Sequence, residues 1–284
     1  MFADGASLDG DPVAVSIALL VGSPLGLWFA GLWGALWGSF FNVCIHRVGL
    51  YQSVVRPPSR CPRCGRGVRP LENVPILSWF FLRGRCAGCH LPISVRYPIV
   101  EAASCALAVM LWLHLLHRGG DPLHVLSAFF YYFALLGVLI VLTGIDVDHF
   151  IIPDVITYPA IPIFFVGALL VREVPLRELV LGPFVGYGLV LVIAELGYLI
   201  TGREVMGYGD AKLLAVVGAA LGWRAPFVAF FTAPFVGLLV MVPLLLLRRR
   251  RVLGGGEVPY GPFLAFASVA YLFFFDDLAG LWPF

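Results

Sequence analysis

The sequence predicts an all-α polytopic membrane protein with about eight transmembrane helices and one small polar domain between the first and the second. Of its 284 residues, 60% are hydrophobic and 13% are charged, whereas soluble domains average roughly 45–50% and 25%. The apolar residues gather in runs of about 17 to 30, each long enough to cross ~30 Å of hydrocarbon. The formal net charge of +2 is too small to indicate a nucleic-acid partner.

The first apolar segment is interrupted by Ser23-Pro24, where we expect a kink or a helix start. It shows no small-residue cleavage site of a removed signal peptide, so we interpret it as a span. The sixth segment is short and rich in glycine, and its boundaries are the weakest part of the count. The eight predicted spans are Val13–Val43, Pro98–Leu116, Leu123–Ile145, Val155–Val171, Leu179–Ile200, Ala211–Gly222, Pro226–Leu247 and Pro259–Phe275.

The distribution of basic residues predicts the orientation of the spans. Fifteen Lys and Arg residues lie in the loop 47–97 and in alternate later loops, against four in the other loops. The positive-inside bias therefore places the first set in the cytoplasm and both termini outside. The run Arg248–Arg251 is interpreted as a topological anchor.

Four of the six cysteines form two CxxC pairs in the polar loop, Cys61/Cys64 and Cys86/Cys89. Two such pairs can close a tetrahedral Cys₄ zinc site, and a loop of about 50 residues needs a staple of this kind. A disulfide or dithiol site is the alternative, which a reducing compartment disfavours. His90 is a less favoured substitute ligand.

Cys44 and Cys105 lie within or beside spans and are interpreted as small hydrophobic residues. Four thiolates around one Zn²⁺ carry a formal charge of −2, which neighbouring cations are expected to compensate. The four candidates are Arg63, Arg66, Arg83 and Arg85.

Acidic residues inside membrane spans are functional candidates. Asp146 ends the third span and Asp210, in Gly207-Tyr208-Gly209-Asp210, begins the sixth from the same side. If the two carboxylates approach closely, repulsion makes them share one proton, as in aspartic peptidases. The glycines before Asp210 would let a substrate backbone approach. The alternative is that both acids only cap span ends.

Other polar residues near these acids have simpler interpretations. Asp154 follows Pro153 and is expected to cap the fourth span, while Asp148 and His149 are expected to be interfacial. Glu195 lies deep in the fifth span and is either a buried, hydrogen-bonded residue or part of a polar path.

An ordered set of motifs from Gly38 onward resembles the bacterial type IV prepilin leader peptidase and N-methyltransferase family of pilus and type II secretion systems. The set comprises Gly38–Val43, both CxxC pairs, Asn73–Trp79, Arg83–Cys86, Ile93–Glu101, Asp146–Asp154, the GxGD motif Gly207–Asp210 and Pro259–Phe263. The resemblance implies an eight-span GxGD enzyme. Such an enzyme removes a basic leader after a glycine from prepilin or pseudopilin precursors and methylates the new N-terminus from S-adenosylmethionine.

The resemblance also implies roles for individual residues. Asp146, seven residues before Pro153, and Asp210 would be the catalytic pair. The cysteine loop would mark the bifunctional form and carry structural zinc. Candidate residues of the S-adenosylmethionine site are Glu72, Asn73, Gly84, Arg96 and Glu101.

We therefore expect three parts along the chain: residues 1–46 with the first span, 47–97 as the cytoplasmic, zinc-ribbon-like, methyltransferase-associated domain, and 98–284 as the peptidase domain. The enzyme would lie in the bacterial inner membrane with its active site on the cytoplasmic side. A presenilin-like intramembrane peptidase is disfavoured by the zinc loop. A non-enzymatic zinc-ribbon scaffold or transporter is the third hypothesis, disfavoured because no repeated half is visible.

Overall fold

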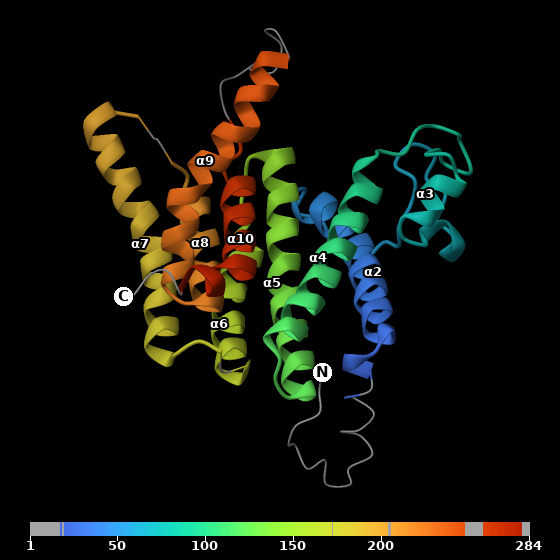
Figure 1. Cartoon of the computed structure of the whole chain (residues 1–284). Helices are drawn as coiled ribbons and strands as arrows, with labels where there is room; N and C mark the ends of the chain where they lie inside the picture. Colours follow the sequence, from blue (N-terminus) through green and yellow to red (C-terminus); the bar gives the residue numbers. More distant parts are fainter. Residues whose placement is uncertain (1–17, 19, 172, 204–205, 248–257, 280–284) are drawn as a thin grey trace. The chain divides into compact units, whose positions relative to one another are not determined.

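The computed structural model describes residues 18, 20–171, 173–203, 206–247 and 258–279, and the regular secondary structure of this part of the chain is helical (Figure 1). Among the described residues, eight helices carry the predicted spans, and two shorter ones lie in the polar loop. The elements are α2 (Pro24–Val48), η1 (Pro70–Asn73), α3 (Leu77–Phe81), α4 (Arg96–Arg118), α5 (Pro122–His149), α6 (Asp154–Val171), α7 (Leu176–Thr201), α8 (Tyr208–Leu221), α9 (Arg224–Leu247) and α10 (Gly261–Ala279).

Each of the eight predicted spans overlaps one of these helices, and α2 begins at Pro24, where a kink or a helix start was predicted. Six of them, namely α2, α4, α5, α6, α7 and α9, are long and apolar enough to cross a membrane. The helix α8 has 14 residues, and the apolar part of α10 is also short. A polytopic membrane protein is confirmed, and the count of eight spans stays a prediction. The Arg248–Arg251 run and both chain ends, which the predicted orientation uses, fall outside the described residues.

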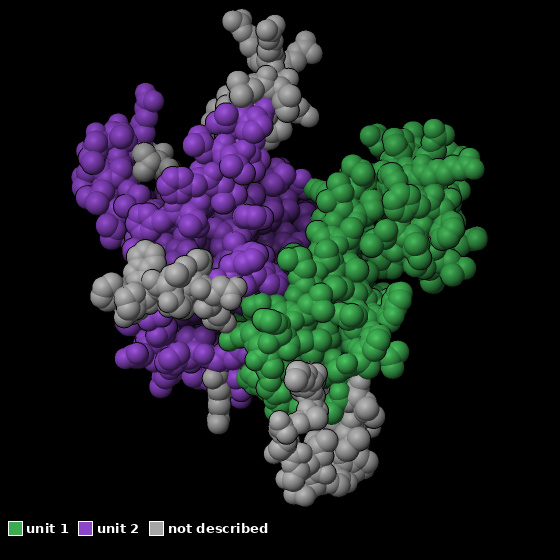
Figure 2. All heavy atoms as spheres, viewed as in Figure 1, with its two compact units in different colours: residues 1–39, 60–134 green, residues 40–59, 135–284 purple. Residues whose placement is uncertain are grey.

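The chain forms two compact units, which Figure 2 colours separately. Unit 1 contains residues 1–39 and 60–134, and unit 2 contains 40–59 and 135–284. This division follows packing and differs from the three parts expected from the sequence. It assigns the end of α2 and the following segment to the same unit as α6 to α10. The predicted functional boundaries therefore stay a prediction.

Within unit 1, α2 and α4 cross at small residues. A methyl group at Gly34 would lie 2.5 Å from the carbonyl oxygen of Ser104 and 2.7 Å from the Cβ of Ala108. A methyl group at Gly38 would lie 2.8 Å from the Cα of Glu101. The two glycines, four residues apart, therefore permit close backbone contact between these helices, as small residues do in membrane proteins.

Within unit 2, α8 is the central helix and contacts α6, α7, α9 and α10. All its residues from Ala211 to Leu221 are buried except the partly exposed Lys212. The backbones of α7 and α8 meet at Gly182 and Gly218, where neither position has room for a Cβ. The same crossing brings Gly186 against the carbonyl of Leu214. This packing fixes the first turn of α8, where Asp210 lies.

Candidate active site and metal centre

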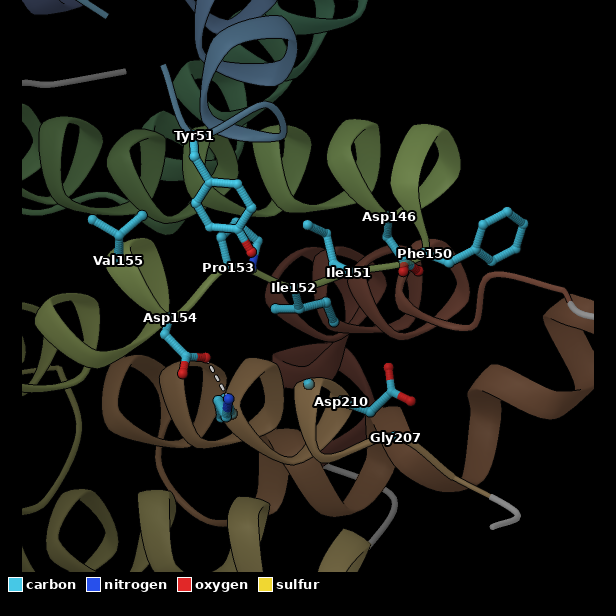
Figure 3. Close-up of a pocket in the computed structure, with 12 residues that line it drawn as sticks. Tyr51, Asp146, Phe150, Ile151, Ile152, Pro153, Asp154, Val155, Gly207 and Asp210 are labelled. Carbon is cyan, nitrogen blue, oxygen red and sulfur yellow. Dashed lines mark hydrogen bonds and ion pairs between the residues drawn. The ribbon is translucent and has the colours of Figure 1, made fainter. Parts of the chain in front are cut away.

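A cavity of about 630 Å³ lies in unit 2 where α5 ends and α8 begins. Both Asp146 and Asp210 line it, together with Tyr51 from the segment after α2 (Figure 3). The structure thus brings the two predicted acids to one cavity, although 64 positions separate them in the chain. The apolar part of the wall comes from the link between α5 and α6 and the first turn of α6, namely Phe150, Ile151, Ile152, Pro153 and Val155.

Asp146 lies near the end of α5 and is 6% exposed. Its carboxylate oxygen Oδ2 accepts a hydrogen bond of 3.0 Å from the backbone N–H of Gly261. Gly261 is the first residue of α10, where backbone N–H groups have no partner within the helix. The carboxylate therefore receives a fixed donor from the positive end of a helix.

The sequence alone assigned no role to Gly261. Its only signal was the motif Pro259–Phe263, in which Gly261 is followed by Pro262. A methyl group at Gly261 would lie 2.7 Å from Oδ2 of Asp146. The glycine is therefore needed for the approach of α10 to the acid.

Asp210 lies in the first turn of α8 and is 9% exposed. Its backbone N–H donates to the carbonyl oxygen of Gly207 at 3.1 Å, which closes the turn that starts the helix. The charge of Asp146 acts on Asp210, and Figure 3 shows the two carboxylates facing the same cavity. Two carboxylates that face one site can share a single proton.

The two glycines of the GxGD motif differ in their surroundings. A methyl group at Gly209 would lie 3.0 Å from the Cβ of Ile152, so this glycine lets α8 pack against the α5–α6 link. The space around Gly207 is open, since a methyl group there would have its nearest neighbouring atom 3.9 Å away. Of the two glycines, only Gly207 therefore has open space beside it, whereas Gly209 serves packing.

Asp154 and Lys212 form an ion pair at the wall of the cavity. Asp154 was expected to cap the helix that follows it. It is instead the first residue of α6, and its Oδ1 accepts a hydrogen bond from Lys212 Nζ. The ammonium of Lys212 also lies 5.3 Å from the ring centre of Tyr158. The pair therefore ties the first turn of α6 to α8 beside the two acids.

The remaining polar residues near the spans do not line this cavity. The ring of His149 packs against Gly49, and neither His149 nor Asp148 is among the lining residues. Glu195 is exposed, and its Oε1 accepts a hydrogen bond of 3.2 Å from the hydroxyl of Tyr208. The expectation that Glu195 is buried is therefore wrong, while its hydrogen bond is present.

The four cysteines of the two CxxC pairs in unit 1 come together. Their sulfur atoms all lie within 4.8 Å of one another, and the Sγ atoms of Cys61 and Cys89 are 3.9 Å apart. A tetrahedron with Zn–S bonds of about 2.3 Å separates its sulfur atoms by about 3.8 Å. The site therefore fits Zn²⁺, and His90 is not part of the cluster.

The two CxxC pairs have matching backbone turns. The N–H of Cys61 donates to the carbonyl of Arg66 and that of Cys86 to the carbonyl of Leu91, both at 2.9 Å. Gly65 and His90 occupy the same place in the two turns, with φ of 72° and 55°. Such paired knuckles are the arrangement of a zinc ribbon.

The surroundings of the cysteines favour thiolates. The backbone N–H groups of Cys89 and Gly88 lower the pKa of Cys86 to about 6, and a thiolate is the form that binds metal. Arg66 interacts electrostatically with Cys86 and Cys64. Arg66 is therefore one of the cations expected to compensate the cluster.

Two candidates for the S-adenosylmethionine site have structural partners in unit 1. Glu72 forms an ion pair of 2.8 Å with Arg66 and accepts from the Arg69 N–H at 3.1 Å, and its pKa is lowered mainly by the bond from Arg66. Glu101 accepts a bond of 2.6 Å from the N–H of Ile76. Both carboxylates are thus already engaged by the protein.

The other three candidates are spread over different elements. Gly84 has φ of 63° and lies against the ring of Trp79. Asn73 ends η1 and Arg96 begins α4. The assignment of all five residues to the cofactor stays a prediction.

Comparison with known proteins relates both halves of the chain to one group of enzymes. Residues 32–115 match the family described as Bacterial Peptidase A24 N-terminal domain, and residues 133–242 match the Type IV leader peptidase family. The chain is 35% identical to a prepilin leader peptidase/N-methyltransferase of Dichelobacter nodosus, over 89% of this chain and 93% of that protein.

Proteins of the same name from two other bacteria are similar to the chain. Identity is 36% with that of Aeromonas hydrophila, over 87% of this chain and 90% of the relative, and 39% with that of Myxococcus xanthus, over 78% and 64%. No solved structure matches the chain.

Proposed function

This chain belongs to the type IV leader peptidase family, and from that premise we propose that Asp146 and Asp210 are the two acids of its peptidase site. The family is one of aspartic peptidases, so the chain is an enzyme. We propose that it removes the leader from type IV prepilin-like precursors and then methylates the new N-terminus. The observation that carries the peptidase proposal is that the two acids, from α5 and α8, line one cavity.

The chemistry needs one ionised and one protonated carboxyl group. The ionised carboxylate takes a proton from a water molecule, which attacks the carbonyl carbon of the scissile peptide bond. The protonated acid donates to the carbonyl oxygen and later assists departure of the amine. Because the N–H of Gly261 stabilises a negative charge on Asp146, we assign the base to Asp146 and the acid to Asp210.

The open space at Gly207 supports approach of an extended substrate backbone beside Asp210. The walls at Ile152, Pro153 and Val155 are apolar. Apolar side chains beside the acids lower the local dielectric and so strengthen their electrostatic interactions.

We further propose that the cavity faces the cytoplasm and that the membrane is the bacterial inner membrane. The membrane-spanning helices support a multi-pass protein, and the excess of basic residues in loop 47–97 favours the cytoplasmic side for that loop. The precursor substrates and the lipid bilayer are the partners of this proposal.

Zinc has a structural role in this proposal. Four cysteine ligands complete a tetrahedral site and leave no position for substrate or water. The ion would hold the two knuckles, which begin at Cys61 and Cys86, in one small domain. S-adenosylmethionine would supply the methyl group, and the double name of the relatives supports this second activity.

The proposal is tested with purified enzyme and a prepilin-like peptide whose cleavage is followed by mass spectrometry. D146N and D210N should each abolish the loss of mass that marks leader removal, while the fraction of folded protein is unchanged. D148N is the matched control, because Asp148 lies on the same helix end but does not line the cavity. An inactive D148N beside an active D146N would show that the catalytic acid was wrongly assigned.

Two alternatives are not favoured. A non-enzymatic scaffold or transporter disagrees with membership of a peptidase family. A presenilin-like intramembrane peptidase disagrees with the names of the relatives, which combine leader peptidase with N-methyltransferase.

A further inference from the structure

Tyr51 occupies an unusual position on the cavity of unit 2. It lines the cavity that contains Asp146 and Asp210, although it comes from the segment after α2, far away in the sequence. The residue is 83% exposed. A large aromatic residue with so little burial contributes little to stability, so its placement has no explanation in the packing of the fold.

The backbone around Tyr51 is held in a conformation that such residues seldom adopt. Its φ is 55°, which is rare for a bulky side chain. The N–H of Tyr51 donates to the carbonyl of Val48 at 2.9 Å, and that of Gln52 donates to the carbonyl of Arg47 at 2.8 Å. The guanidinium of Arg47 donates to the carbonyl of Ser53 at 3.2 Å. Strain that the surroundings fix in this way is typical of functional positions.

The segment is also fixed relative to the catalytic end of α5. The ring of His149 lies against Gly49, where a methyl group would come within 2.4 Å of the ring. His149 follows Asp146 by three residues, which places the two on one face of the helix. Packing at Gly49 therefore sets the position of Tyr51 with respect to Asp146.

The cavity has two parts of different character. In Figure 3 the carboxylates of Asp146 and Asp210 face one part, and Tyr51 lies on the side of Pro153 and Val155. Val155 is 67% exposed, so this part presents apolar surface that the fold does not cover. A bound peptide that reaches the two acids would cover it.

We propose that Tyr51 is a specificity-determining residue, whose ring forms with Pro153 and Val155 a subsite for an apolar side chain of the peptide near the cleaved bond. The proposal rests on the proposed peptidase function. Aromatic contact with an apolar side chain accounts for the exposure of Tyr51 in the free enzyme, and the hydrogen bonds from Arg47 and Gln52 account for its fixed position.

An aromatic anchor at the membrane interface is the competing explanation for an exposed tyrosine. The chain supplies a matched control, Tyr198 near the end of α7. Tyr198 is 53% exposed and does not line the cavity. An interfacial role would make the two tyrosines equivalent, whereas a subsite singles out Tyr51.

The experiment measures kcat and KM of Y51A, Y51F and Y198A with a precursor peptide whose apolar residues near the cleaved bond are replaced by serine one at a time. Y51A should raise KM about tenfold, as expected for loss of an aromatic contact, with kcat within about twofold. Y51F and Y198A should resemble the unmodified enzyme. At one peptide position, the serine substitution should raise KM for the unmodified enzyme and have no further effect on Y51A.

Equal kinetics of Y51A and the unmodified enzyme, or additive effects at every peptide position, would overturn the subsite while leaving the peptidase in place. Equal losses in Y51A and Y198A would show an interfacial role and would also overturn it. If the unmodified chain cleaves no precursor, the proposed function fails first. Binding of a labelled peptide to the unmodified protein and to Y51A then decides the subsite, and equal affinities would refute it.

Discussion

Substitution of Gly261 by alanine should reduce catalysis without unfolding the protein. The new methyl group would lie 2.7 Å from Oδ2 of Asp146, whereas ordinary contact begins near 3.4 Å, so the carboxylate must move by about 0.7 Å. Movement on this scale weakens the hydrogen bond from the Gly261 N–H, and bonds to charged groups contribute about 1.5–3 kcal/mol. A misplacement of about 1 Å can lower a rate ~10²-fold. We therefore expect kcat to fall about 10- to 100-fold.

The folded state should tolerate this change, because Oδ2 is the end of a side chain that can rotate. The thermal unfolding midpoint of G261A should shift by no more than about 2–4 °C, which corresponds to ~1 kcal/mol for a protein of this size. The assay compares peptide cleavage and thermal unfolding with those of G188A, since a methyl group at Gly188 meets nothing within 4 Å. A kcat of G261A within about threefold of that of G188A would refute the assigned role of the Gly261 N–H.

Three further predictions concern the metal, the ion pair and the second activity. Protein prepared without chelator should contain one Zn²⁺ per chain, and C64S should increase hydrogen exchange in residues 60–97 before it affects the spans. An elemental analysis that finds no metal, or a Cys61–Cys64 disulfide, would contradict this. D154N should lower the free energy of unfolding by about 1–3 kcal/mol, because it leaves Lys212, whose side chain is 15% exposed, without its carboxylate. The double variant D154N/K212M should recover most of this loss. Equal stability of the single and the double variant would argue against the ion pair. D146N should still methylate a peptide that begins at the mature N-terminus, while E72Q and G84K should reduce methylation more than cleavage. Labelled S-adenosylmethionine measures methylation and mass spectrometry measures cleavage. The absence of a methylated product from the unmodified enzyme would restrict the chain to proteolysis.

The convergence of the four cysteines could be predicted from the sequence. The spacing of Cys61, Cys64, Cys86 and Cys89 specifies two short turns whose sulfur atoms converge by local geometry. What the spacing did not show is that His90 occupies the turn position of Gly65. That equivalence depends on backbone conformation, and a histidine next to a cysteine gives no sign of it.

Asp146 and Asp210 could be proposed as the catalytic pair from their motifs, but the residues around them could not be predicted. Gly261 donates to Asp146 and Tyr51 lines the same cavity as Asp146, although the two residues come from distant parts of the chain that no periodicity links. Lys212 and Asp154 were both visible as charged residues near span ends, yet their pairing depends on how α6 packs on α8. Through-space contacts of this kind need the tertiary structure.

The weak sequence signal of α8 follows from its place in unit 2. A helix that faces lipid needs long apolar side chains, whereas α8 is surrounded by α6, α7, α9 and α10. The glycine contact between Gly182 and Gly218 lets its backbone approach α7 without side chains in between, and such approaches favour small residues over hydropathy. The small residues of α8 therefore reflect its burial among these helices. The same burial holds Asp210 in a fixed first turn at the cavity, so substitutions that enlarge Gly182 or Gly218 should displace the acid together with the helix.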